Sequence, residues 1–122
     1  MRKQHFIVAV ILLIFGSMAM AQDVKEKTGI EVLRERNFDV LQGKRVGLCT
    51  NPTGVDRHLV STIDILWEAD NVNLVALYGP EHGVRGNIYA GDHVDNEVDA
   101  RTGLKMYSLY GKTSKPTKEM MD

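Results

Sequence analysis

The stretch Gly79–Gly86 carries a carboxyl, an imidazole and a guanidinium within five residues, at Glu81, His82 and Arg85. It directly follows an apolar run, Val72–Tyr78, which indicates a buried strand. In open α/β sheets ligands bind at the C-terminal ends of the strands, because loops and helix N-termini converge there. A carboxyl at such a place can act as a general acid or base if burial raises its pKa. We expect His82 and Arg85 to orient a substrate or hold an anionic group.

A second polar turn, Asn51-Pro52-Thr53-Gly54, ends the short β-prone run Val46–Thr50. Because the two turns follow neighbouring strands of one predicted β-α-β unit, we expect both to open on the same edge of the sheet. Asn51 and Thr53 then add an amide and a hydroxyl to the Glu81 carboxyl. This combination suits a polyhydroxylated ligand such as a sugar.

Plainer roles for these side chains stay open. The two polar residues of the first turn could only satisfy backbone groups, a use that both residue types favour. His82 could bond a backbone carbonyl, and Arg85 could only pair with Asp92 or Asp95, which would be weak evidence for function. Glu81 has no obvious packing role between a proline and a histidine, so it is the strongest candidate.

A metal site is the main chemical alternative, since several suitable ligand types are present: His58, His82, His93, Glu81, Asp92 and Asp95. No pair has the i, i+4 spacing of the familiar zinc helix. The turn after the first strand also lacks the G-x-G-x-x-G and Walker patterns of nucleotide sites. We therefore predict no metal and no cofactor.

The elements that must position these residues follow from hydrophobic periodicity and turn signals. Thr28 and Glu31 have capping-box spacing and predict a short helix that ends near Asn37. Apolar residues at helical spacing predict an amphipathic helix over 59–69, and its Trp67 is expected to pack in the core. With the strands on either side, this gives a parallel β-α-β crossover. Cys49 is predicted to be a small buried core residue.

The rest of the chain is less regular. Residues 83–103 form a long, polar, glycine-rich excursion, of the kind that is usually functional or disordered. Residues 104–110 predict a partly buried strand. Pro116–Glu119 predicts a helix start close to the end of the printed sequence, so we expect a chain that is a fragment of a longer protein.

The N-terminus has the pattern of a cleavable signal peptide over residues 1–21. A basic start and the apolar run Phe6–Phe15 precede Ala19-Met20-Ala21, with cleavage expected after Ala21. The run is too short for a typical membrane span, which needs about 20 residues. Removing residues 1–21 changes the formal charge from −1 to −3, which argues against a nucleic-acid partner. We expect a periplasmic or secreted protein with no stable membrane span, in which residues 22–27 are a loose leader.

Several ordered motifs resemble one family, the exo-β-N-acetylmuramidases of the NamZ type. The resemblance runs from about Thr28 to the C-terminus and rests on the segments Gly47–Arg57, Ser61–Asp64, Gly79–Gly86, Thr102–Leu104 and Tyr107–Gly111. It implies a Rossmann-like N-terminal domain with a mostly parallel sheet, partial over residues 28–122, and a second domain beyond it. It also implies a cleft between the two domains.

The resemblance implies an activity as well: release of N-acetylmuramic acid from the non-reducing ends of muropeptides or other peptidoglycan-derived glycans, in cell-wall recycling. The resemblance implies that the family's catalytic glutamate maps onto Glu81, and that Asn51, His82 and Arg85 fall on motif positions near the substrate. Glycoside hydrolysis normally needs two groups that flank the bond, and the second is open between Asp92, Asp95 and sequence beyond this chain. A non-catalytic glycan-binding fragment and a metal-dependent hydrolase are the alternatives.

Overall fold

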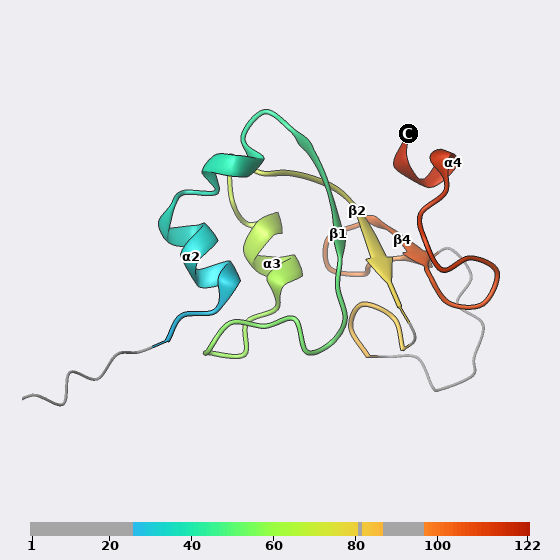
Figure 1. The fold of residues 1–122 in the computed structure, drawn as a ribbon, viewed down its shortest axis with the longest axis horizontal. Helices are drawn as coiled ribbons and strands as arrows, with labels where there is room; N and C mark the ends of the chain where they lie inside the picture. The colour runs from blue at the N-terminus through green and yellow to red at the C-terminus, as the bar shows by residue number, and fades with distance from the viewer. Residues whose placement is uncertain (1–25, 81, 87–96) are drawn as a thin grey trace, which may run out of the picture.

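The computed structural model describes residues 26–80, 82–86 and 97–122, and Figure 1 shows their course. Their centre is a four-stranded sheet in the order β1-β2-β4-β3. β1 (Arg45–Cys49), β2 (Asn73–Gly79) and β4 (Lys105–Ser108) run parallel, and β3 (Glu97–Val98) pairs antiparallel with β4. The expected mixed α/β fold with a mostly parallel sheet is confirmed.

Two helices cover one face of this sheet (Figure 1). α2 (Gly29–Glu35) is followed by the 3-10 turn η1 (Asp39–Leu41), and α3 (Thr62–Trp67) connects β1 to β2. The predicted capping box is present, since the Thr28 backbone N–H donates to Glu31 Oε2 at 2.7 Å. The core between helices and sheet is apolar and consists of Phe38, Ile63, Ile65, Leu66, Leu74, Leu77 and Val84.

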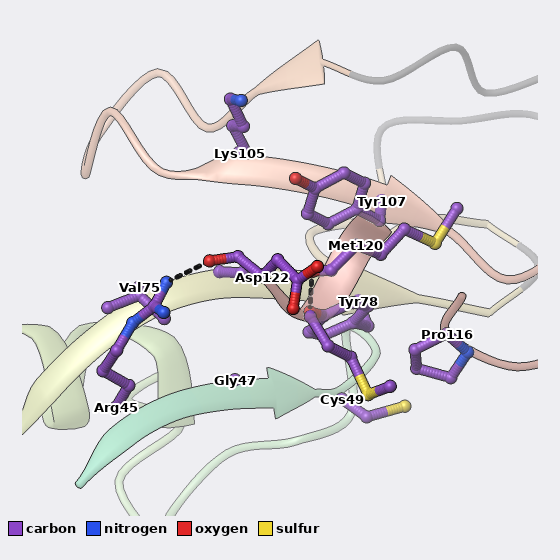
Figure 2. Close-up of a pocket in the computed structure, with 12 residues that line it drawn as sticks. Arg45, Gly47, Cys49, Val75, Tyr78, Lys105, Tyr107, Pro116, Met120 and Asp122 are labelled. Carbon is purple, nitrogen blue, oxygen red and sulfur yellow. Dashed lines mark hydrogen bonds between the residues drawn. The ribbon is translucent and has the colours of Figure 1, made fainter. Parts of the chain in front are cut away.

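The opposite face of the sheet is only partly covered, by the short helix α4 (Lys118–Met121). Tyr78 Oη donates to the Met120 carbonyl at 2.5 Å, and Arg45 donates to the Asp122 carbonyl at 2.9 Å (Figure 2). The Tyr78 and Tyr107 rings stack on this face, with 5.4 Å between their centroids. The strand predicted over 104–110 is confirmed over Lys105–Ser108, which form β4.

Cys49 is exposed, so its prediction as a buried core residue is wrong. The side chains of β1 alternate between the two faces of the sheet. Val46 and Leu48 pack against the core on the helix side, whereas Cys49 lies with Gly47 on the face that α4 only partly covers (Figure 2).

The helix predicted over 59–69 begins later, at Thr62. Ser61 is its N-cap, and the Ser61 hydroxyl accepts from the Ile63 N–H. Leu59 has a left-handed backbone and is 80% exposed, because the Asp56 carboxylate holds the preceding loop through the His58 and Val60 N–H groups, each at 2.9 Å.

Trp67 does not lie in the core as predicted. It is the last residue of α3 and is 43% exposed, because Ile63 and Leu66 take the side that faces the sheet.

No helix in the described part of the chain is long and apolar enough to cross a membrane. The predicted signal peptide, residues 1–21, and most of the leader 22–27 lie outside the described residues.

Candidate functional site

The turn after β1 is stabilised by its own polar side chains. Asn51 Oδ1 accepts from the Thr53 N–H at 3.1 Å and from the Thr53 hydroxyl at 2.8 Å. This is the turn-forming use of asparagine, and it occupies the amide oxygen. Within the described part of the chain, the Asn51 NH₂ group has no acceptor, and both residues are exposed at the sheet edge.

The turn after β2 is tight. The Gly83 N–H donates to the Pro80 carbonyl at 3.1 Å, and a Cβ on Gly79 would lie 3.1 Å from Gly83 Cα. His82 has φ +70° with an exposed side chain. A left-handed backbone is unfavourable for a residue with a Cβ, and such strain clusters at functional sites. Glu81, the predicted catalytic residue, lies outside the described residues.

The two turns meet at the same edge of the sheet, as expected. A Cβ on Gly86 would lie only 2.8 Å from Pro52 Cγ, so the backbone at Gly86 packs directly against the first turn. Backbone bonds extend the pairing past the strand ends: the Thr50 N–H donates to Tyr78 O at 3.0 Å, and the Leu109 N–H donates to Gly79 O at 2.8 Å. Three strand ends therefore contribute to one edge.

Arg85 lies between two buried aspartates. Its Nε donates to Asp99 Oδ1 at 2.5 Å and its Nη2 to Asp99 Oδ2 at 3.0 Å. Nη2 also donates to Asp64 Oδ1 at 2.8 Å, and Nη1 lies 3.5 Å from Asp64 Oδ2. The side chain of Asp64 is 11% exposed and that of Asp99 is 3% exposed. The partners considered from the sequence, Asp92 and Asp95, lie outside the described residues.

The electrostatics of this cluster fix its charge state. The Arg85 guanidinium, together with the Thr102 hydroxyl and N–H, lowers the pKa of Asp99 to about 2. Hydrogen bonds to Asp99 and Asp64 raise the pKa of Arg85 above its usual value. Both groups of the Arg85–Asp99 pair are therefore charged at every pH at which an enzyme would normally work.

Sequence reasoning missed Asp64, Asp99 and Thr102. Asp64 lies in the first turn of α3, and the Thr102 N–H and hydroxyl donate to Asp99 Oδ2 at 3.0 and 2.8 Å. The contact between Asp99 and Thr102 had a local signal, an aspartate three residues before a threonine. The pairing of Arg85 with Asp64 spans 21 residues and has no local signal.

The described residues contain no group of three or more His, Cys, Asp or Glu side chains that could hold a metal ion. Of the ligand types considered above, His58 and His82 are exposed. The others, Glu81, Asp92, His93 and Asp95, lie outside the described residues.

A cavity of about 530 Å³ lies on the other face of the sheet, between α4 and the strands (Figure 2). Its lining combines the stacked tyrosines with two basic residues, Arg45 and Lys105, and with Cys49 and Met120. It contains none of the predicted site residues. A groove of about 540 Å³ on the helix side is lined by residues of α2, β1, the turn after β1 and α3, and it includes Thr53.

Comparison with known proteins agrees with the motifs. Residues 46–122 match the family described as exo-β-N-acetylmuramidase NamZ, N-terminal. The chain is 46% identical over 132 aligned positions to the peptidoglycan β-N-acetylmuramidase NamZ of Bacillus subtilis (strain 168). The alignment covers 99% of this chain and 32% of that protein.

The fold also matches a solved structure. A crystal structure of a DUF1343 family protein from Bacteroides fragilis NCTC 9343 superposes with a TM-score of 0.70 at 70% identity, over 79% of this chain and 23% of that one. The chain thus spans about a third of the curated relative and less than a quarter of the solved one. The matched segment, the fold and the identity together show that this chain belongs to the NamZ family, with residues 46–122 matching the family's N-terminal model.

Proposed function

We propose that this chain is part of an exo-β-N-acetylmuramidase that removes N-acetylmuramic acid from the non-reducing ends of peptidoglycan-derived glycans. The observation that carries the proposal is the 46% identity to a peptidoglycan β-N-acetylmuramidase across 99% of the chain. The meeting of two polar turns at the carboxyl edge of the sheet supports it, since this is where α/β folds bind ligands.

Glu81 is proposed as the catalytic acid or base. The turn that carries it is held on both sides, by the Pro80–Gly83 hydrogen bond and by the contact between Gly86 and Pro52. The strained backbone at His82 within this turn supports a functional role for the segment.

The second group of the reaction is not Asp64 or Asp99. Both carboxylates are buried and all four of their oxygens accept from Arg85, which keeps them from a substrate. Asp99, with a pKa of about 2, also holds no proton to donate near neutral pH. Asp92 and Asp95 stay as the candidates in this chain. Asn51, Thr53 and His82 are proposed to bind substrate hydroxyls, with the Asn51 NH₂ group and the His82 imidazole available for that purpose.

The test is hydrolysis of a chromogenic N-acetylmuramic acid glycoside by the product of the complete reading frame that contains this chain. Glu81→Gln should lower kcat by about 100- to 10,000-fold, the range that loss of one general acid or base typically produces. The matched control is Glu35→Gln on the exposed end of α2, where the side chain is 56% exposed and turnover should stay unchanged. Full turnover by the Glu81 variant would refute the assignment, and binding of muropeptides without release would favour a glycan-binding module instead.

We further propose that the protein is exported, on the strength of the basic start, the apolar run and the small residues before position 22. Intact mass of the protein recovered from the cell envelope or medium should show the loss of residues 1–21. A mass that retains them would contradict cleavage after Ala21.

A further inference from the structure

We propose that Arg85 is a positioning residue, which holds the turn after β2 in place through Asp64 and Asp99, and that it does not bind the substrate. The inference deepens the proposed function and rests on it. It replaces the sequence-based expectation that Arg85 holds an anionic group of the ligand.

The geometry of the guanidinium carries this inference. An arginine has five N–H donors in a planar fork, and four of the Arg85 donors are directed at the two aspartates. One N–H of Nη1 remains, so an anionic ligand could form a bidentate pair with the guanidinium only by displacing a buried carboxylate. Asp99 would then lose its counter-ion, whereas Asp64 would keep Arg101, whose Nε lies 3.4 Å from Asp64 Oδ1.

The three partners come from three different parts of the fold. Asp64 belongs to the first turn of α3, Arg85 to the turn after β2, and Asp99 to the connection between β3 and β4. Asp99 is itself fixed, because the Thr102 hydroxyl and N–H donate to it and its N–H donates to the Leu104 carbonyl at 2.9 Å. Arg85 thus ties the turn to two rigid neighbours.

The adjacent residues show what this tie holds. Val84 is 3% exposed and belongs to the core, and Gly86 packs against Pro52 of the other candidate turn. A shift of Arg85 would therefore move the exposed His82 and change the distance between the two turns. A misplacement of about 1 Å in an active site can cost about 100-fold in rate, so the ion pairs have a direct route to activity.

The first test measures local order and does not need activity. Hydrogen exchange is followed for the amides of residues 79–86 in the complete gene product. Arg85→Met and the nearly isosteric Asp99→Asn should each speed this exchange about tenfold or more, while β1 and β2 stay protected. The amides of Arg85→Lys should exchange as fast as those of Arg85→Met, since an ammonium cannot make two bidentate pairs.

The second test separates positioning from substrate contact by kinetics. Arg85→Met and Asp99→Asn should each lower kcat by about 10- to 100-fold with KM within about threefold of wild type. The double variant should be no slower than the slower single variant, because both changes break the same tie. Thr102→Val keeps both charges and should give a smaller change in the same direction, which guards against a variant that fails to fold.

A matched control is the exposed pair of Arg36 and Asp39, with 2.9 Å between Nη2 and Oδ2. Arg36→Met should change neither exchange in 79–86 nor kcat. The proposal is overturned if Arg85→Met raises KM tenfold or more while Asp99→Asn leaves activity intact, or if exchange in 79–86 does not respond to either variant. Absence of muramidase activity in the wild type would refute the proposed function alone, because the exchange arm still decides whether Arg85 orders the turn.

Discussion

Asp99 should make the stability of this protein fall steeply in acid, between about pH 4 and pH 2. Its carboxylate accepts from Arg85 Nε and Nη2 and from the N–H and hydroxyl of Thr102, with a side chain only 3% exposed. These contacts hold the pKa of Asp99 at about 2, against an ordinary value of 3.8. The folded state therefore binds the proton less well than the unfolded state does.

The sign and size of the effect follow from that difference. The stabilisation is fully present above the unfolded pKa, near 4, and is lost as the pH falls through the folded pKa, near 2. A tenfold difference in acid dissociation constant is worth about 1.4 kcal/mol, so the whole effect has an upper limit of about 2 kcal/mol. Water at the partly exposed guanidinium screens the pair and reduces this to about 1–2 kcal/mol.

The assay is urea unfolding of wild type and Asp99→Asn, followed by circular dichroism at pH 5, 4, 3 and 2. The difference in free energy of unfolding between the two proteins should shrink by about 1–2 kcal/mol from pH 5 to pH 2. Using this difference removes the contribution of Glu31, whose pKa is also lowered to about 2 by Arg57 and Thr28. Asp39→Asn, in an exposed pair, should show a much smaller change. A difference that stays constant with pH would refute the argument that Asp99 is held ionised.

Three further predictions concern the backbone and the open face. Gly86→Ala should destabilise the protein by about 1–2 kcal/mol in urea, because φ is +76° and the new Cβ would meet Pro52; unchanged stability would show that the two turns do not touch. His82→Gly should stabilise it by about 0.5–1 kcal/mol by relieving the left-handed backbone, and a loss of stability would contradict that strain. Cys49 should react fully with a thiol reagent under native conditions, because it is exposed; protection until unfolding would mean that its face of the sheet is covered.

The β-α-β unit could be predicted because its signals are local. The apolar run before Gly79 and the helical spacing after Ser61 are each readable within a short window. The start of α3 could not be placed by periodicity, since Leu59 fits the helical spacing but has φ +63° and is exposed. The capping signal of Ser61 identifies the true start, and it outweighs an apolar residue that merely has the right spacing.

The two faces of the sheet were harder to predict than its strands. Alternation along β1 was visible in the sequence, but which side the helices would cover was not. Assigning Cys49 to the core assumed that a short apolar strand is buried on both faces, as in parallel sheets with helices on both sides. In the described residues α2 and α3 cover one face, and only α4 lies over the other.

The sequence was enough to predict where the candidate site lies in the fold, but not what each of its residues does. Strand ends and turn residues placed Asn51 and His82 at one edge of the sheet, which the contact of Gly86 with Pro52 bears out. The role of Arg85 depends on partners in two other elements, and no local pattern encodes such pairing.

The ion pairs also narrow the search for the catalytic acids. A general acid must bind a proton near the working pH, whereas a hydrogen-bonded guanidinium lowers the pKa of a carboxyl, as Arg85 does at Asp99. The low pKa of Asp99 removes it as a general acid, and the ion pairs with Arg85 give both Asp64 and Asp99 a structural task. The same ion pairs anchor the turn three residues after Pro80–His82, where Val84 enters the core and the chain passes Pro52. An acid at position 81 is thereby carried by a segment whose support, the Arg85–Asp99 pair, stays charged until the pH falls toward about 2. A loss of activity in milder acid should therefore come from protonation of groups within the site and not from loosening of this support.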